Sequence, residues 1–152
     1  GRTLASNDLL RNVSGVYEGA GMHERAYSVY REAIDRQLAH SPDSSPVPVY
    51  MNNLAYTYST TNKNLDRGFR LSRLAIAGAS SRTPSYLDTL GWLHYRNGNL
   101  DRAETDVRRA LRTSGGTGSA LAELYEHLAD IREAKGFDGE AYWMRRFYRS
   151  LK

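Results

Sequence analysis

Apolar residues recur at helical spacing along most of the chain, in pairs of short segments separated by turns. The segment 84–96 begins with Pro-Ser, and its apolar face is formed by Leu87, Leu90, Leu93 and His94. Asn97-Gly98-Asn99 interrupts this pattern, because Gly98 readily takes the left-handed conformation that ends a helix. A second amphipathic stretch begins at Leu100. A connection this short predicts two antiparallel helices in contact with each other.

The same arrangement recurs with a period of about 35 residues. Turns comparable to 97–99 occur in GMHERA (21–26), NKNLDRG (62–68), GNLDRA (98–103) and GFDGEA (136–141). Each of the four units has small residues at three corresponding positions, with Tyr148 as the one exception. These positions are Ser14, Ala26, Ala33, Ala55, Gly68, Ala75, Gly91, Ala103, Ala110, Ala129, Ala141 and Tyr148.

Gly91 shows why small residues are needed at these positions. Two helices that pack at an interaxial distance of about 8–10 Å need small residues where they cross. A glycine inside a helix costs roughly 1 kcal/mol relative to alanine, and close approach of the partner helix offsets this cost. We therefore expect Gly91 to lie where the second helix of its pair crosses the first. Since neither helix of a pair buries its apolar face alone, the pairs are expected to stack.

This pattern of large and small positions resembles the tetratricopeptide repeat (TPR). In the third unit it is carried by Leu87, Leu90, Gly91, His94, Ala103, Val107 and Ala110. The resemblance implies an all-α fold, a right-handed superhelical stack of about four antiparallel helix pairs. It covers nearly the whole chain as one domain, 1–152, with repeats at 7–40, 48–83, 84–117 and 122–152. Residues 41–47, rich in Pro and Ser, are expected to form an inter-repeat loop.

The resemblance also implies a concave groove lined by the first helix of each pair. The positions that would face this groove hold seven acidic and two basic residues. The strongest candidates for binding a peptide there are Asn52, Asn53, Tyr56, Asp88, Trp92, Tyr95, Glu126 and Asp130. Asparagine can both donate to and accept from a peptide backbone, and aromatic rings supply rigid contact area. In the alternative interpretation, Trp92 and Tyr95 only pack against neighbouring helices.

The charge of the chain bears on the class of partner. The 152 residues carry a formal net charge of +4, with eighteen Arg and only three Lys. The excess of Arg is typical of a GC-rich, bacterial genome, but it also raises the question of nucleic acid binding. Most of the Arg falls on the second helices, whereas the expected groove is acidic and would repel phosphate. The sequence therefore favours a protein or peptide partner, neutral to basic, over nucleic acid. Helical-repeat RNA binding and a purely structural, self-assembling role are the alternatives.

The sequence contains no pattern that predicts catalysis or a cofactor. The chain has no cysteine and no HExxH motif, and SGGTGS (114–119) follows a helix and lacks the Lys-Ser/Thr ending of a phosphate loop. Glu126, His127 and Asp130 are interpreted as a solvated helix face rather than as metal ligands. We therefore expect a non-catalytic scaffold with no metal, no cofactor and no membrane span. The compartment stays open between cytoplasm and periplasm.

The last helical segment has a second line of apolar residues. Trp143 and Phe147 lie four residues apart and away from the face expected to pack inward. An uncovered aromatic pair would be an interaction patch, for a second copy of the domain or for flanking repeats of a longer chain. Alternatively, both rings fold down against Tyr125 and Leu121 and complete the core.

Overall fold

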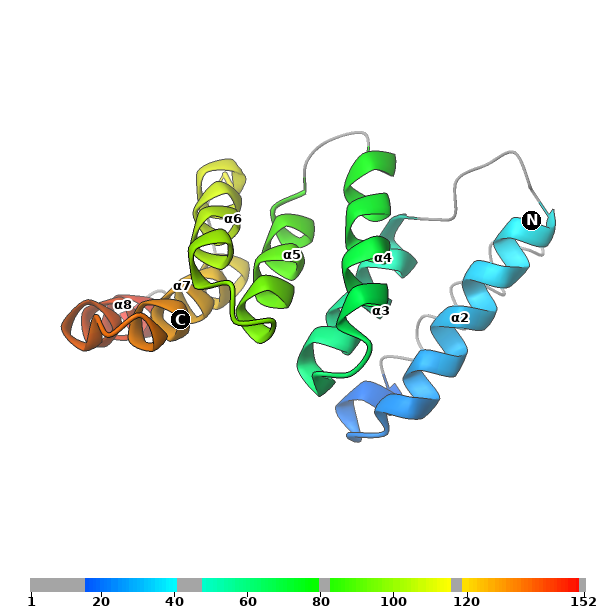
Figure 1. Cartoon of the computed structure of the whole chain (residues 1–152), viewed down its shortest axis with the longest axis horizontal. Coiled ribbons are helices and arrows are strands. Elements are labelled where there is room, and N and C mark those ends of the chain that lie inside the picture. The colour runs from blue at the N-terminus through cyan, green and yellow to red at the C-terminus, as the bar shows by residue number, and fades with distance from the viewer. Residues whose placement is uncertain (1–15, 41–47, 80–82, 116–118, 151–152) are drawn as a thin grey trace. The chain divides into compact units, whose positions relative to one another are not determined.

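The computed structural model describes residues 16–40, 48–79, 83–115 and 119–150 (Figure 1). These residues form helices and turns, and none of them lies in a strand, which confirms the all-α prediction. Residues 16–19 are helical, and the helices that follow are α2 (His23–His40), α3 (Pro48–Thr61), α4 (Leu65–Gly78), α5 (Pro84–Arg96), α6 (Leu100–Thr113), α7 (Ser119–Ala134) and α8 (Asp138–Ser150). The predicted loop 41–47 and residues 7–15 of the predicted first repeat lie outside the described residues. No described helix is both long and apolar enough to cross a lipid bilayer.

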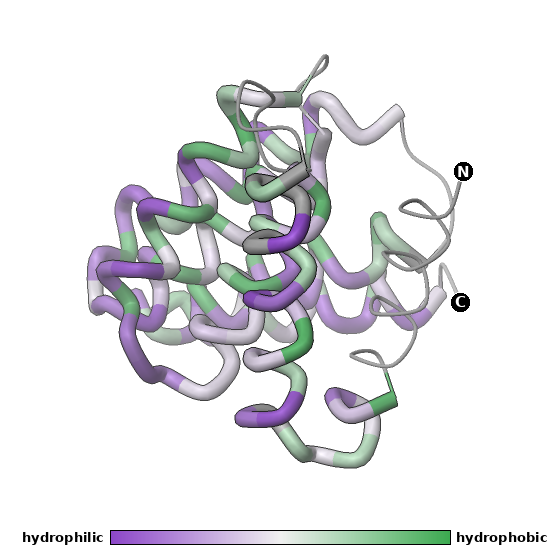
Figure 2. Tube along the Cα trace, turned by 90° about the vertical axis from the view of Figure 1, so that its right-hand side faces the viewer, coloured by the Kyte–Doolittle hydropathy of each residue, from purple (hydrophilic) through white to green (hydrophobic). Residues whose placement is uncertain are grey.

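The chain divides into two compact units, residues 1–78 and 79–152. The first unit contains α2, α3 and α4, and the second contains α5 to α8. Three-residue turns connect α3 to α4, α5 to α6 and α7 to α8, so each of these pairs is an antiparallel hairpin. Hydrophobic and hydrophilic residues alternate along the helices (Figure 2), as expected where one face of each helix packs inward.

Four helical segments end in the same turn. Gly98 has a φ of +81°, and the N–H groups of Gly98 and Asn99 donate to carbonyls in the last turn of α5 at 3.1 and 2.9 Å. This pair of hydrogen bonds satisfies carbonyls that the helix end would otherwise leave without a donor. The same pair forms at Gly21, Asn62 and Gly136, each with a positive φ. The conformation predicted for Gly98 is confirmed, and Asn62 takes the corresponding position in the turn that lacks a glycine.

The small residues of the repeat pattern are buried wherever their burial is described. Ten of the twelve positions qualify, namely Ala26, Ala33, Ala55, Gly68, Ala75, Gly91, Ala103, Ala110, Ala129 and Ala141. Tyr148, the position that departs from the pattern, is half-buried. The periodicity therefore marks the inward-facing positions of successive helices.

Gly91 lies at the crossing of α5 and α6, as predicted. A Cβ atom at this position would be 2.8 Å from Cγ2 of Val107, 3.2 Å from the carbonyl oxygen of Ala103 and 3.4 Å from Cβ of Asp106. Ala103 and Val107 are fully buried. The two backbones thus approach so closely that even one methyl group would require a shift.

A network of charges joins α6 to the end of α7. The carboxylate of Glu104 accepts hydrogen bonds from Arg108 at 2.9 Å, from Arg132 at 3.0 Å and from Lys135 at 2.7 Å. Burial by itself would raise the pKa of Glu104, but the hydrogen bonds from Lys135 and Arg108 and the charge of Arg132 lower the pKa to about 2. Glu104 is therefore ionised at neutral pH and holds two helix pairs of the second unit together.

In the first unit, an aromatic contact joins α2 to α3. The rings of Tyr27 and Tyr58 stack with their centroids 4.6 Å apart, and both residues are buried. The hydroxyl of Tyr27 donates to the carbonyl oxygen of Thr57 at 2.9 Å and also contacts the hydroxyl of Thr61. Tyr27 can therefore be buried between α2 and α3, because its ring packs inward and its hydroxyl group has a hydrogen-bond partner.

Candidate functional site

The second unit contains a polar cluster between α5 and α7, which are the first helices of its two helix pairs. Asp88 and Trp92 are four residues apart on α5, and Glu123 and His127 are four residues apart on α7, so each pair lies on one helix face. The two faces meet at Asp88 and His127, both of which are only 7% exposed. The cluster is thus formed by residues 39 positions apart in the chain, about one repeat.

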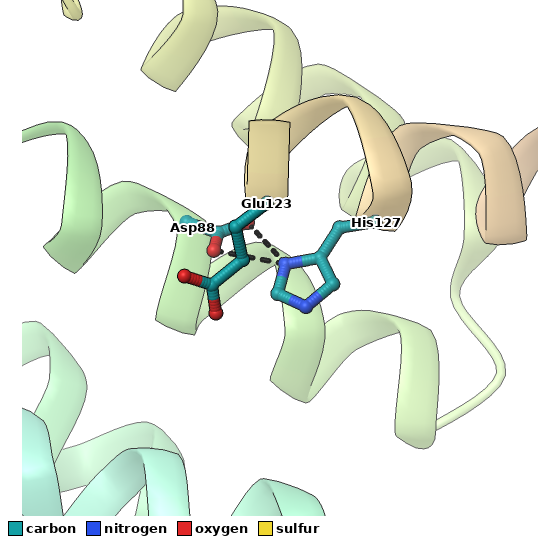
Figure 3. A group of neighbouring side chains, drawn as sticks. All are labelled: Asp88, Glu123 and His127. Carbon is teal, nitrogen blue, oxygen red and sulfur yellow. Dashed lines mark hydrogen bonds and ion pairs between the residues drawn. The ribbon is translucent and has the colours of Figure 1, made fainter. Parts of the chain in front are cut away.

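Asp88 and His127 form a buried ion pair. Nδ1 of His127 donates to both carboxylate oxygens of Asp88, at 2.8 and 2.9 Å (Figure 3). Burial alone would lower the pKa of His127. The hydrogen bond that His127 donates to Asp88 and the charges of Asp88, Glu123 and Asp130 outweigh that effect and raise the pKa above its ordinary value. Asp88 therefore holds the ring in a fixed orientation and favours its protonated form.

Stacked aromatic rings flank this pair. The ring of Trp92 stacks on that of His127 with centroids 4.2 Å apart and on that of Tyr95 with centroids 4.5 Å apart. Trp92 and Tyr95 are both half-buried. Both side chains are thus partly packed against neighbouring helices and partly accessible to a partner. The contact with His127 restrains the indole ring of Trp92.

A pocket opens beside the ion pair. Its volume is about 220 Å³, and it is lined by Pro84, Ser85, Asp88, Ser114, Ala120, Glu123 and Leu124. Most of the wall is apolar, and Asp88 and Glu123 supply its two carboxyl groups. The Glu123 residue as a whole is exposed, yet the pKa of its carboxyl group is raised. Burial of the carboxyl group is the largest cause, and the charges of Asp88 and Glu126 raise the pKa further, whereas the charge of His127 lowers it. An apolar pocket with two close carboxyl groups is suited to a ligand that brings positive charge.

Three potential metal ligands converge at the same place. One carboxylate oxygen each from Asp88 and Glu123 and a ring nitrogen of His127 all lie within 4.8 Å of one another (Figure 3). No other group of three or more acidic or histidine side chains in metal-binding reach occurs among the residues that the structure describes. No metal ligand was expected from the sequence, because the register that brings Asp88, Glu123 and His127 together is not visible in it.

The two remaining groove candidates of α7, Glu126 and Asp130, differ in exposure and in whether they are paired with a cation. Glu126 is exposed. Asp130 is half-buried and accepts a hydrogen bond from Arg145 of α8 at 2.8 Å, and Arg145 also donates to Glu133 at 2.6 Å. The groove candidate Asp130 and the nearby Glu133 are therefore already paired with a cation of the same chain. The negative charge left for a partner is concentrated at Glu123, Glu126 and the Asp88 pocket.

The candidates Asn52, Asn53 and Tyr56 lie together on α3 of the first unit. Asn52 is 7% exposed, and its Oδ1 atom accepts no hydrogen bond from any described residue. Asn53 and Tyr56 are half-buried, and the backbone carbonyl of Asn53 accepts from the hydroxyl of Thr57 at 2.9 Å. A buried polar atom without a hydrogen-bond partner is uncommon, and α3 has two such atoms among the described residues, Oδ1 of Asn52 and the hydroxyl of Tyr58.

The two aromatic residues of α8 that form the second apolar line, Trp143 and Phe147, differ in how much they pack against other residues. Trp143 is 65% exposed, and its ring packs edge-to-face with that of Tyr142 and lies beside the guanidinium of Arg146. Phe147 is 50% exposed and packs edge-to-face on Tyr125 at 5.2 Å. The sequence left two alternatives open for the pair: Trp143 matches the uncovered patch, and Phe147 lies partly down on Tyr125.

Solved structures with the same architecture cover nearly the whole chain. BtubC (BKLC) from P. vanneervenii matches with a TM-score of 0.70 and 22% identity over 95% of this chain and 62% of that one. MamA matches with a TM-score of 0.65 and 14% identity over 95% of this chain and 77% of that one. A tetratricopeptide repeat protein from Parabacteroides merdae ATCC 43184 matches with a TM-score of 0.53 and 16% identity over 95% of this chain and 65% of that one. The chain has the tetratricopeptide-repeat fold.

The TPR fold thus confirms the resemblance seen in the repeat pattern, although no protein-family model and no curated protein sequence matches the chain. This chain spans less than two thirds of the length of the BtubC structure. Within the TPR fold, the described small positions lie in the interior, and the cluster around Asp88 lies between the first helices of two successive pairs.

Sequence reasoning missed the role of His127. It placed this residue on a solvated face with Glu126 and Asp130, whereas His127 is buried and paired with Asp88. The reason is that His127 lies three residues after Leu124 and four before Ile131, both buried, so it shares their inward face and meets α5 rather than solvent. The one signal in the sequence was that Asp88 and His127 lie about one repeat apart. To predict their contact from this spacing, the register between successive helix pairs must be known.

Proposed function

We propose that this domain is a non-catalytic scaffold for protein interactions and that the second unit binds a basic side chain of a peptide or protein segment. One observation carries the proposal: the 220 Å³ pocket combines an apolar wall with the carboxyl groups of Asp88 and Glu123. A lysine or arginine has an apolar stem and a cationic end, which matches such a wall. Solved structures with this fold include a tetratricopeptide repeat protein, and peptide binding on the first helices is consistent with that architecture.

The neighbouring residues suit the rest of such a segment. The half-buried rings of Trp92 and Tyr95 offer rigid contact area, and they stack on each other and on His127, which reduces the entropy lost on binding. Glu126 and Asp130 add negative charge on α7, although Asp130 shares its charge with Arg145. A neutral to basic segment therefore fits this face better than a phosphate backbone, which the carboxylates would repel.

The α3 residues extend the proposal to the first unit. Asn52, Asn53 and Tyr56 share a helix face, and Oδ1 of Asn52 lacks a donor among the described residues. This oxygen is itself buried, whereas the half-buried amide of Asn53 can both donate to and accept from a peptide backbone. We propose that these three residues bind a peptide backbone in the first unit and that the Asp88 pocket selects a basic side chain in the second unit.

The test is selection of short peptides from a random displayed library, with EDTA present so that metal ions play no part. We expect the selected peptides to contain Lys or Arg and Glu123→Gln to weaken their binding about tenfold, or about 1.4 kcal/mol. Glu32→Gln is the matched control, because it removes the same charge from an exposed side chain of α2. Selected peptides without basic residues, or equal affinity for wild type and Glu123→Gln in fluorescence anisotropy, would refute the proposal.

A second function is favoured by α8 alone. Trp143 and Tyr142 are both more than half exposed and stack edge-to-face, and Phe147 lies on the same helix. Such an aromatic surface fits a self-association or interdomain patch that contacts a second copy or flanking repeats. This role would be structural and would use no residue that lines the Asp88 pocket.

A further inference from the structure

We propose that Asp88, Glu123 and His127 bind a divalent transition-metal ion such as Zn²⁺, with an open coordination position beside the adjoining pocket. The proposal goes beyond peptide binding and does not depend on it. It rests on three side chains of two ligand types, from two helices, whose potential ligand atoms lie within 4.8 Å of one another. Imidazole nitrogen and carboxylate oxygen are both ordinary ligands of Zn²⁺.

The distances between the ligand atoms require little rearrangement. Zn–N and Zn–O bonds of about 2.0–2.2 Å place tetrahedral ligand atoms roughly 3.3–3.5 Å apart. Nδ1 of His127 is already 2.8 and 2.9 Å from the two oxygens of Asp88, so a cation would replace the shared proton after shifts of a few tenths of an ångström. Only the Glu123 carboxyl has further to move, and its exposed side chain makes no hydrogen bond or ion pair within the described part of the chain.

The surroundings hold the two buried ligands in place. Trp92 stacks on the ring of His127 at 4.2 Å, which restrains the imidazole plane. Asp88 is 7% exposed and fixed by its contact with His127. Asp88 and His127 are thus already held in position, and only the side chain of Glu123 would lose conformational freedom when a metal ion binds. This arrangement favours binding by three ligands.

Charge favours a cation at this point. Asp88 and Glu123 place two carboxyl groups at one pocket, where only His127 offsets them. A divalent ion would neutralise both carboxylates, and the pocket next to Asp88 and Glu123 leaves space for water or an incoming ligand at the fourth position. Three protein ligands plus one open position is the pattern of sites that exchange ligands rather than of closed structural sites.

The second unit contains its own comparison site. His94 and Asp106 also form a buried histidine–aspartate pair, with Nε2 of His94 3.7 Å from the carboxylate. No third acidic or histidine ligand joins them within metal-binding reach among the described residues. A histidine–aspartate pair without a third ligand therefore exists between α5 and α6, and His94→Gln serves as the matched control.

The experiment is isothermal titration of the full chain, free of any polyhistidine tag, with ZnCl₂, followed by visible absorption with CoCl₂. We expect one Zn²⁺ per chain and ligand-field bands of Co²⁺ in wild type and in His94→Gln. Glu123→Gln should weaken Zn²⁺ binding about tenfold or more, and His127→Gln should abolish it together with the Co²⁺ bands. Far-ultraviolet circular dichroism on each variant shows whether the fold is kept.

Two outcomes would overturn the assignment. The first is Zn²⁺ binding with unchanged affinity in Glu123→Gln, a substitution of an exposed side chain that is expected to leave the fold intact. The second is no Zn²⁺ binding to wild type in the titration. Neither outcome bears on the peptide proposal, because peptide selection is carried out in EDTA, and loss of peptide binding would leave the Zn²⁺ titration unaffected.

Discussion

Replacing Gly91 by alanine tests the close crossing of α5 and α6 with the smallest possible change. A Cβ atom there would be 2.8 Å from Cγ2 of Val107, whereas carbon atoms pack at about 3.5–4.0 Å. Val107 is fully buried and β-branched, so it has little room to rotate away. The second neighbour, 3.2 Å away, is the backbone oxygen of Ala103, which moves only if α6 moves.

Two opposing contributions set the expected magnitude. Overpacking of a tight core costs about 1–3 kcal/mol, and removing a helical glycine gains up to about 1 kcal/mol. We therefore expect Gly91→Ala to lower the free energy of unfolding by about 1–2 kcal/mol and Gly91→Leu to lower it by about 3 kcal/mol or more. Val107→Ala should cost at least 1 kcal/mol less in the Gly91→Ala background than in wild type, because it removes the nearest clash.

The assay is urea unfolding followed by tryptophan fluorescence. Both tryptophans of the chain, Trp92 and Trp143, belong to the second unit, so the signal reports on that unit. Gly139→Ala is the matched control, since a Cβ added to this glycine of α8 would meet nothing within 4 Å. It should be neutral or stabilising. A Gly91→Ala variant as stable as wild type, or more stable, would refute the inferred crossing.

Three further predictions concern charge, binding and association. The pKa of about 2 for Glu104 lies below its ordinary value of 4.5, so its ion pairs contribute stability above pH 4.5 that is lost as the pH falls toward 2. Glu104→Gln should therefore be about 1–2 kcal/mol less stable than wild type at pH 6 and nearly equal to it near pH 2 in urea unfolding. Combined Asn53→Ala and Trp92→Ala should abolish binding of library-selected peptides while the circular dichroism spectrum is kept; unchanged binding would exclude these residues from the groove. Combined Trp143→Ser and Phe147→Ser should convert any dimer to monomer in light scattering with little loss of stability, since both rings are at least half exposed. A monomer in both cases with a large loss of stability would instead show that the rings belong to the core.

Much of the fold was predictable because its determinants are local or periodic. Gly98 takes the left-handed conformation expected from its place between two amphipathic stretches, since helix termination depends on a few neighbouring residues. The buried small residues were predictable for a different reason: Gly91 and its counterparts recur at the repeat period, and repetition reveals a packing constraint that one helix alone would hide.

The candidate site was predictable only in part, because its contacts depend on the register between successive helix pairs. The sequence identified Asp88 and Trp92 by their helix face, but it could not show that Asp88 is buried against His127. It also counted Asp130 as a free acid, whereas Arg145 of α8 reaches it. The first contact joins successive helix pairs, and the second joins the two helices of one pair. In both cases packing sets the relative shift of the helices along their axes, and this shift leaves no periodic signal in the sequence.

Stability and binding therefore depend on different positions of the same helices. Gly91 and Val107 occupy the α5–α6 crossing, where the space for a side chain is already filled, so a substitution there changes the fold before it changes a surface. Glu123 and Trp92 lie at the opposite boundary, between α5 and α7, where a pocket remains and side chains are partly accessible. Substitutions at this second boundary can alter charge and ligand preference at little cost in packing. Asp88 and His127 are buried and paired with each other, whereas the exposed Glu123 and the adjoining pocket stay accessible, which is the physical reason to propose a binding role for this polar cluster.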